Sequence, residues 1–313
     1  MQILNSLVPI FAVIGLGIVL RRKNFLTADT TQGFNRFAYY FALPLFLFYR
    51  LGSAPSNFGN AESFLVTLLS ASVVTRIAGW VVSGLTGTRF GSRGAMIQAC
   101  FRGNLAFMGL PLVIFTTYDL PLEQKAQLES AALLTIAPVV IFYNAASVAA
   151  LAIYNEQSER NFSWKTVGFN FVFNPLLIAC VLGLLVQKIG WEMPTAAVRT
   201  CEVLGASAFP LALLGIGSQL ASISVTGHIW ESLVASFLKC VVCPVVGWLV
   251  GRWAGLSGSE LQVILILCAV PTAVSSYVLV DQMKGDSGLA ASSVVIGTAV
   301  SLLTLSILLA IPF

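Results

Sequence analysis

The chain has 313 residues, of which 57% are hydrophobic and only 10% charged, with a formal net charge of +4. Soluble globular proteins carry about 25% charged residues, so this composition excludes that class and predicts an integral membrane protein. The positive charges are spread along the chain, which relates them to membrane topology and argues against nucleic-acid binding.

At about 20 residues for each membrane-spanning helix, the chain has room for roughly ten spans and little else. We therefore predict an all-α fold of ten transmembrane helices. In chain order, the predicted spans are 3–20, 34–52, 62–86, 94–117, 129–153, 165–187, 197–221, 228–251, 259–281 and 287–311.

Lysine and arginine predict the orientation of these spans. The loops between spans one and two, three and four, five and six, and nine and ten lie on one side of the membrane. They hold nine basic residues: Arg21, Arg22, Lys23, Arg36, Arg89, Arg93, Arg160, Lys165 and Lys284. The loops and span ends on the opposite side hold five: Arg50, Lys125, Lys188, Arg199 and Arg252. Basic loops stay in the cytoplasm, so both termini are predicted to be extracytoplasmic. The expected location is a bacterial inner membrane, where the lipid bilayer surrounds the spans.

Two pairs of prolines indicate an internal repeat. Pro9 and Pro44 are 35 residues apart, as are Pro175 and Pro210, and the two pairs are offset by 166 residues. Five spans in each half would invert the second half relative to the first, as in many secondary transporters. The predicted units are 1–153, a cytoplasmic linker 154–164, and 165–313. The alternative is that prolines are simply frequent in membrane helices.

Spans four and nine each contain residues that interrupt a helix. Span four carries Arg102-Gly103-Asn104 and span nine carries Pro271, at similar positions in the two halves. The half-helix after each interruption presents free N–H groups and a positive dipole end, which favour an anion. We predict a substrate site at this crossing. The predicted lining residues are Arg102, Gly103, Asn104, Leu105, Pro271, Thr272 and Asn174.

Other readings of these side chains remain open. Arg102 could be a structural charge held by carbonyls, and Asn104 could form an interhelical hydrogen bond. The other intramembrane charges, Arg76, Lys239 and Glu202, are candidates for coupling or support, because an ionised group within a span is usually functional.

No cofactor or metal is expected. Cys240 and Cys243 have CxxC spacing, but they lie in an apolar run and are interpreted as buried hydrophobes. Spans four and nine have no carboxylate near the crossing, which favours proton coupling or facilitated diffusion over sodium. The sequence also lacks a nucleophile–base pair and a Walker motif, so neither an enzyme nor an ATP-driven pump is expected.

Several motifs together resemble one known family. They are Arg102-Gly103-Asn104 with Gly109-Leu110-Pro111, Ala269-Val270-Pro271-Thr272-Ala273, Gly285-Asp286, and Asn174-Pro175. The chain resembles the auxin efflux carrier family of permeases from end to end. It lacks only the long loop between spans five and six that is present in many plant members.

That resemblance implies a fold related to the bile acid–sodium symporter superfamily. It implies a scaffold of spans one, two, six and seven that forms a homodimer, and an elevator-like transport unit of spans three to five and eight to ten. The implied function is transport of a small organic anion, such as malate, malonate or an auxin-like carboxylate. The alternatives are a sodium-coupled symporter of a larger organic anion and an anion channel.

Overall fold

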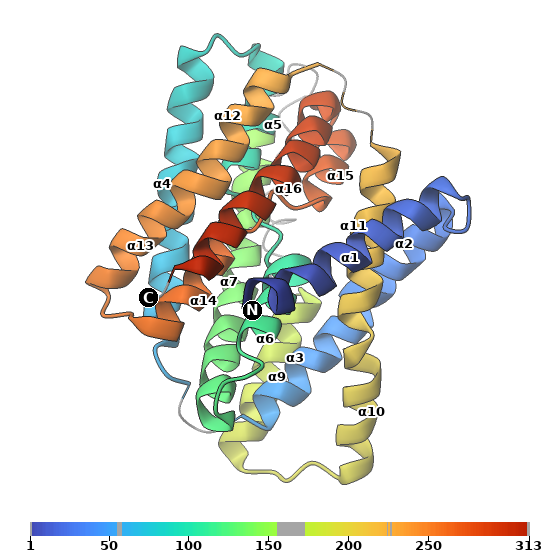
Figure 1. Ribbon diagram of the computed structural model, residues 1–313, viewed down its shortest axis with the longest axis vertical. Coiled ribbons are helices and arrows are strands. Elements are labelled where there is room, and N and C mark those ends of the chain that lie inside the picture. The colour runs from blue at the N-terminus through green and yellow to red at the C-terminus, as the bar shows by residue number, and fades with distance from the viewer. Residues whose placement is uncertain (1, 55–57, 155–172, 224, 226, 312–313) are drawn as a thin grey trace.

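A computed structural model describes residues 2–54, 58–154, 173–223, 225 and 227–311, and within them helices are the dominant element (Figure 1). Five helical segments are long and apolar enough to cross a membrane: Ala61–Leu85, Leu122–Ile153, Thr195–Ser222, Ile229–Trp253 and Ser287–Ala310. Shorter apolar helices accompany them, so the chain is a multi-pass membrane protein whose described residues form helices and no named strands.

The helices follow the predicted order of spans. Their bounds are α1 Gln2–Arg22, α2 Ala28–Phe37, α3 Leu43–Gly52, α4 Ala61–Leu85, α5 Phe90–Phe101, α6 Leu110–Thr116, α7 Leu122–Ile153, α9 Pro175–Ile189, α10 Thr195–Ala206, α11 Ala208–Ser222, α12 Ile229–Phe237, α13 Cys243–Trp253, α14 Gly258–Ala269, α15 Ser275–Gln282 and α16 Ser287–Ala310. Of the predicted linker 154–164, residues 155–164 lie outside the described residues, as does the start of predicted span six, 165–172.

Three π-helical turns precede prolines. They are η1 Ala38–Ala42 before Pro44, η2 Leu105–Gly109 before Pro111, and η3 Leu238–Val242 before Pro244. A proline has no N–H and its ring clashes with the carbonyl four residues earlier. A π turn widens the helix there, so η1 joins α2 to α3 and η3 joins α12 to α13 without interrupting either span.

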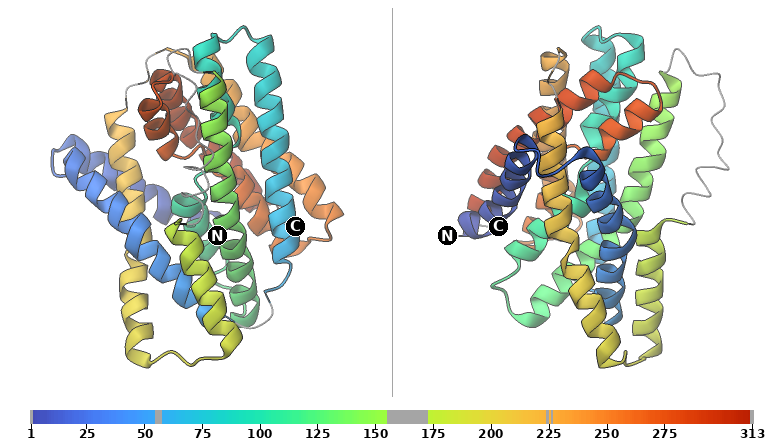
Figure 2. Two further views of the ribbon diagram at one scale, coloured as in Figure 1. Left: turned by 180° about the vertical axis from the view of Figure 1, so that it is seen from behind. Right: turned by 90° about the vertical axis from the view of Figure 1, so that its right-hand side faces the viewer.

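The helices form two groups that lie side by side (Figures 1 and 2). One group consists of α1–α3 and α9–α11, in which α1 packs along α11 and α3 along α9. The other group consists of α4–α7 and α12–α16, in which α4 packs on α13 and α12 on α16. We call the first group the scaffold and the second the crossing unit.

The contact between α1 and α11 depends on glycine. A Cβ atom on Gly217 would overlap the backbone carbonyl of Ile14, and one on Gly17 would overlap that of Leu214. Only glycine lets the two backbones approach so closely, which is a common way for helices to pack in membranes.

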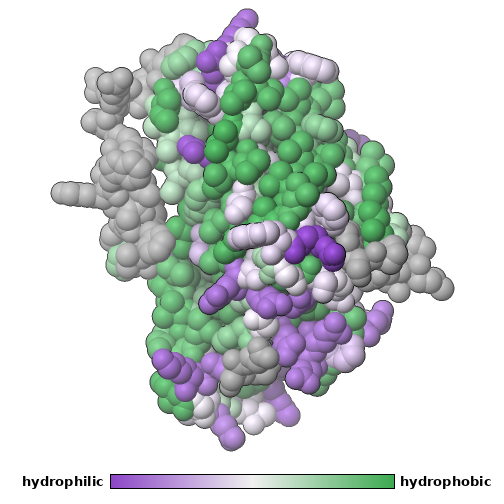
Figure 3. Space-filling model, turned by 90° about the vertical axis from the view of Figure 1, so that its left-hand side faces the viewer, coloured by the Kyte–Doolittle hydropathy of each residue, from purple (hydrophilic) through white to green (hydrophobic). Residues whose placement is uncertain are grey.

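The outer surface is largely apolar. Large hydrophobic side chains such as Leu85 and Trp253 are more than 80% exposed. Figure 3 shows one face on which hydrophobic residues dominate the upper half, while hydrophilic residues gather at the top and in the lower half. Exposure of apolar surface on this scale suits contact with lipid.

Candidate functional site

Two interrupted helices meet in the centre of the crossing unit. Helix α5 ends at Phe101 and α14 ends at Ala269. After these ends, Gly103 and Thr272 form an isolated antiparallel bridge. The Asn104 N–H donates to the Pro271 carbonyl at 2.9 Å, and the Ala273 N–H donates to the Arg102 carbonyl at 2.9 Å. The predicted interruptions in spans four and nine are therefore present and are joined through their main chains.

Polar side chains near the bridge donate hydrogen bonds to backbone carbonyls of the opposite interrupted span. The Thr272 hydroxyl donates to the carbonyl of Ala99 at 2.8 Å, and the Gln98 amide donates to that of Ser276 at 3.2 Å. The Ala99 carbonyl, in the last turn of α5, is thus satisfied from span nine, whereas Ser276 lies in the first turn of α15, so the Gln98 bond ties the two spans together without capping a helix end.

The guanidinium of Arg102 is buried beside this bridge. Only 8% of the residue is exposed. Its Nη2 donates to Asn144 Oδ1 at 2.9 Å and to Ser275 Oγ at 3.3 Å. Its Nη1 is buried and has no hydrogen-bond partner among the described residues. The structure describes three ion pairs, and none of these involves Arg102. A buried cation with a free donor and no carboxylate is the environment that an anionic ligand would complete.

The Asn104 side chain is also available to a ligand. The residue is 6% exposed. Its carboxamide makes no hydrogen bond to any other residue that the structure describes. Only its backbone is engaged at the bridge. Leu105, which follows it, is buried in the apolar core. Asn104 therefore adds a neutral donor two residues along the chain from the Arg102 cation.

The scaffold faces the crossing through Asn174 and Tyr39. Asn174 is 6% exposed and caps α9, because its Oδ1 accepts from the Leu176 N–H at 2.9 Å. The Tyr39 hydroxyl lies near both Asn174 and Arg102. The Tyr39 ring also packs edge-on against Phe107, with the ring centres 6.4 Å apart. Tyr39 thus lies between scaffold and crossing unit, and the sequence analysis did not select it.

The other three predicted charges occupy different places. Lys239 is fully buried and reaches the crossing, where it lies against Gly103. Arg76 instead lines a cavity of about 230 Å³ with Trp80 and other residues of α4, α5 and the end of α7, none of them at the bridge. Glu202 is exposed on α10. Of the three, only Lys239 reaches the bridge between the interrupted helices.

An acidic residue that the sequence analysis left out lies between the two groups of helices. Glu129 of α7 forms an ion pair with Arg50 of α3 at 3.2 Å and accepts from the Thr117 hydroxyl at 3.2 Å. Its side chain is 4% exposed. Span five was predicted to begin at residue 129, but α7 begins at Leu122, so Glu129 lies two turns inside the helix.

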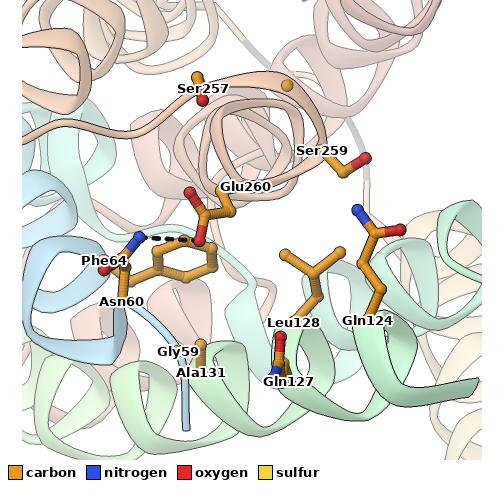
Figure 4. A pocket seen from close by; sticks show the side chains of 11 residues that line it. Gly59, Asn60, Phe64, Gln124, Gln127, Leu128, Ala131, Ser257, Ser259 and Glu260 are labelled. Atoms are coloured by element: carbon orange, nitrogen blue, oxygen red, sulfur yellow. Dashed lines mark hydrogen bonds between the residues drawn. The ribbon is translucent and has the colours of Figure 1, made fainter.

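A larger cavity opens between the N-terminal ends of α4, α7 and α14 (Figure 4). It measures about 390 Å³ and is lined mainly by polar side chains, including Gln124, Gln127 and Ser257. Asn60 closes one side by donating to Glu260 at 2.8 Å. Neither this cavity nor the one at Arg76 includes the bridge residues, which are buried in this conformation.

Comparisons with known proteins find similarity to transporters. A protein of Rhizobium meliloti described as "Putative malonate transporter" is 24% identical over 318 residues, covering 98% of this chain and 95% of its own. The uncharacterized transporter YfdV of Escherichia coli is 24% identical over 291 residues, covering 90% and 88%. An uncharacterized transporter of Methanocaldococcus jannaschii is 24% identical over 136 residues, 42% of this chain and 44% of its own.

The match to a family model is nearly complete. Residues 2–309 fit the family described as membrane transport protein. That range includes both interrupted helices, the buried Arg102 and the scaffold residues that face it. The chain therefore belongs to the membrane transport protein family, the auxin efflux carrier family that its motifs resemble.

Proposed function

We propose that this transporter is a secondary carrier of a small organic anion, a mono- or dicarboxylate of the size of malonate or malate. The observation that carries the proposal is the buried Arg102 guanidinium, which has one nitrogen without a partner and no carboxylate paired to it among the described residues. A substrate carboxylate would accept from that nitrogen and from the Asn104 carboxamide. The description of the Rhizobium relative as a malonate transporter supports the same class of substrate.

We also propose that the chain forms two inverted five-span repeats and that transport is of the elevator type. Helix packing supports this, because α1 contacts α11 in the way that α9 contacts α3, which is the exchange an inverted repeat would produce. In this proposal the crossing unit moves against a scaffold of α1–α3 and α9–α11 that forms the homodimer. Proton coupling is favoured, since no acidic residue lies at the bridge to help hold sodium.

Uptake by purified protein in liposomes tests the proposal. We expect saturable uptake of labelled malonate or malate, accelerated when unlabelled carboxylate is present on the opposite side. Uptake that does not saturate and shows no acceleration would indicate a channel and refute the carrier. If folded protein takes up none of the mono- and dicarboxylates tested, the proposed substrate class is refuted.

The proposed orientation has its own test. With both termini outside, single cysteines introduced near Arg22 and Arg89 should react only with reagents that enter the cytoplasm. Labelling of either position from the outside of intact cells would reverse the topology.

A further inference from the structure

A lysine side chain is buried at the centre of the crossing unit. Lys239 lies in the π turn η3, and none of its surface is exposed. A Cβ atom on Gly103 would lie 3.0 Å from the Lys239 Cε and 3.2 Å from its Nζ. The glycine of the bridge therefore leaves the space that the end of this lysine occupies.

The Lys239 ammonium is held by the end of a helix. Its Nζ donates to the backbone carbonyl of Cys268, in the last turn of α14, and lies 4.0 Å from the Cys243 sulfur. None of the three ion pairs in the described residues involves Lys239. The free carbonyls at a helix C-terminus carry a partial negative charge, so they are suited to a desolvated cation.

The equivalent end of α5 is satisfied without a charge. There the Ala99 carbonyl accepts from the neutral hydroxyl of Thr272. In secondary carriers, the C-terminal ends of interrupted helices and the unwound carbonyls beside them are the groups that coordinate a coupling cation. At the end of α14 a covalently attached ammonium already fills that role.

We propose that Lys239 is a built-in cation, and that its ammonium occupies the place at the end of α14 where a carrier of this architecture would bind a metal cation. The inference rests on the proposed function, because it specifies how that carrier is coupled. It makes transport independent of sodium. It also makes Lys239 a positioning residue, which stabilises the interrupted helix through the Cys268 carbonyl and need not contact the substrate.

The test compares wild type with Lys239→Ala, Lys239→Met and the control Lys188→Ala. Lys188 is also a lysine of an apolar helix, in the last turn of α9, but it is exposed. Thermal unfolding of the substrate-free protein is measured in sodium, choline and methylammonium chloride. We expect the Tm of wild type to be the same in all three salts. The Tm of Lys188→Ala should likewise not depend on the salt.

Lys239→Ala should lower Tm by about 5 °C or more in choline. Methylammonium or sodium should restore at least half of that loss, because either cation can enter the space that the side chain leaves. Lys239→Met fills the space with an apolar chain, so its Tm should not respond to cations. If Lys239→Ala unfolds during purification, adding methylammonium throughout should recover folded protein.

Three results would overturn the inference. They are a wild-type Tm or uptake rate that rises with sodium, a Lys239→Ala variant whose loss no cation reverses, and a Lys239→Met variant that is as stable as wild type. The Tm measurement needs no substrate. If wild type transports no carboxylate but the cation pattern holds, the proposed function fails while the built-in cation stands.

Discussion

Replacing Arg102 with glutamine should separate substrate binding from stability. The guanidinium has one buried nitrogen, Nη1, without a partner among the described residues, so a bound carboxylate would gain a charge-assisted hydrogen bond there. Such a bond contributes about 1.5–3 kcal/mol. Since about 1.4 kcal/mol corresponds to a tenfold change in affinity, Arg102→Gln should weaken carboxylate binding by roughly 10- to 150-fold.

The same substitution should cost little stability. It removes the hydrogen bonds to Asn144 and Ser275, at 2.9 and 3.3 Å, but it also removes a buried charge with no acidic partner among the described residues. Replacing a poorly compensated buried charge with a neutral group is often neutral or stabilising. We therefore expect a Tm equal to or above that of wild type, together with weaker binding.

Binding of labelled malonate to detergent-purified protein, normalised to the folded fraction, is the assay. Asn144→Ala is a matched control that keeps the charge but loosens its position, and its binding should fall less than that of Arg102→Gln. If Arg102 were only structural, Arg102→Gln would lower Tm and leave the affinity of the folded fraction unchanged. That result would refute the reasoning.

Three further predictions concern other positions. Asn104→Ala should weaken carboxylate binding by about 1–3 kcal/mol with little change in Tm, because its backbone bond to Pro271 remains; unchanged affinity in a binding assay would remove Asn104 from the site. Glu129→Gln should destabilise the fold by roughly 1–2 kcal/mol in a denaturant titration, since its arginine partner is 35% exposed and the pair is only half desolvated. A variant as stable as wild type would show that the pair contributes nothing. Gly217→Ala should lower Tm by pushing α11 away from α1, whereas Gly15→Ala, whose Cβ meets no atom within 4 Å, should not; equal Tm values for these two variants would contradict the packing argument.

Local signals in the sequence predicted the interruptions well. Pro271 removes a backbone donor, and Gly103 with its polar neighbours weakens the helix, so each break could be placed without knowledge of the fold. The order of the helical segments followed from hydropathy in the same way. The structure places the two breaks against each other, as their equivalent positions in the two halves of the chain suggested.

The residues that surround the bridge were harder to predict, because their position depends on how each helix is rotated. Tyr39 lies in a π turn, which adds a residue and shifts the helical face, so regular periodicity does not describe it. Span five was predicted to begin at residue 129, yet α7 begins at Leu122 and places Glu129 inside the helix. The position of Lys239 at Gly103, and that of Arg76 away from it, depends on tertiary packing alone.

The bridge between the interrupted helices consists of peptide groups, and this has a consequence for how such a carrier can evolve. Since the Gly103–Thr272 pairing and the two hydrogen bonds beside it use only main-chain atoms, most side chains there can be exchanged without loosening the joint. Gly103 is the most constrained of these positions, since a Cβ atom there would lie 3.0 Å from the Lys239 Cε and 3.0 Å from a Val270 methyl group. If Asn104 and its neighbours bind the cargo as proposed, a lineage built on this joint can acquire new cargo through a few substitutions there, while its architecture stays unchanged.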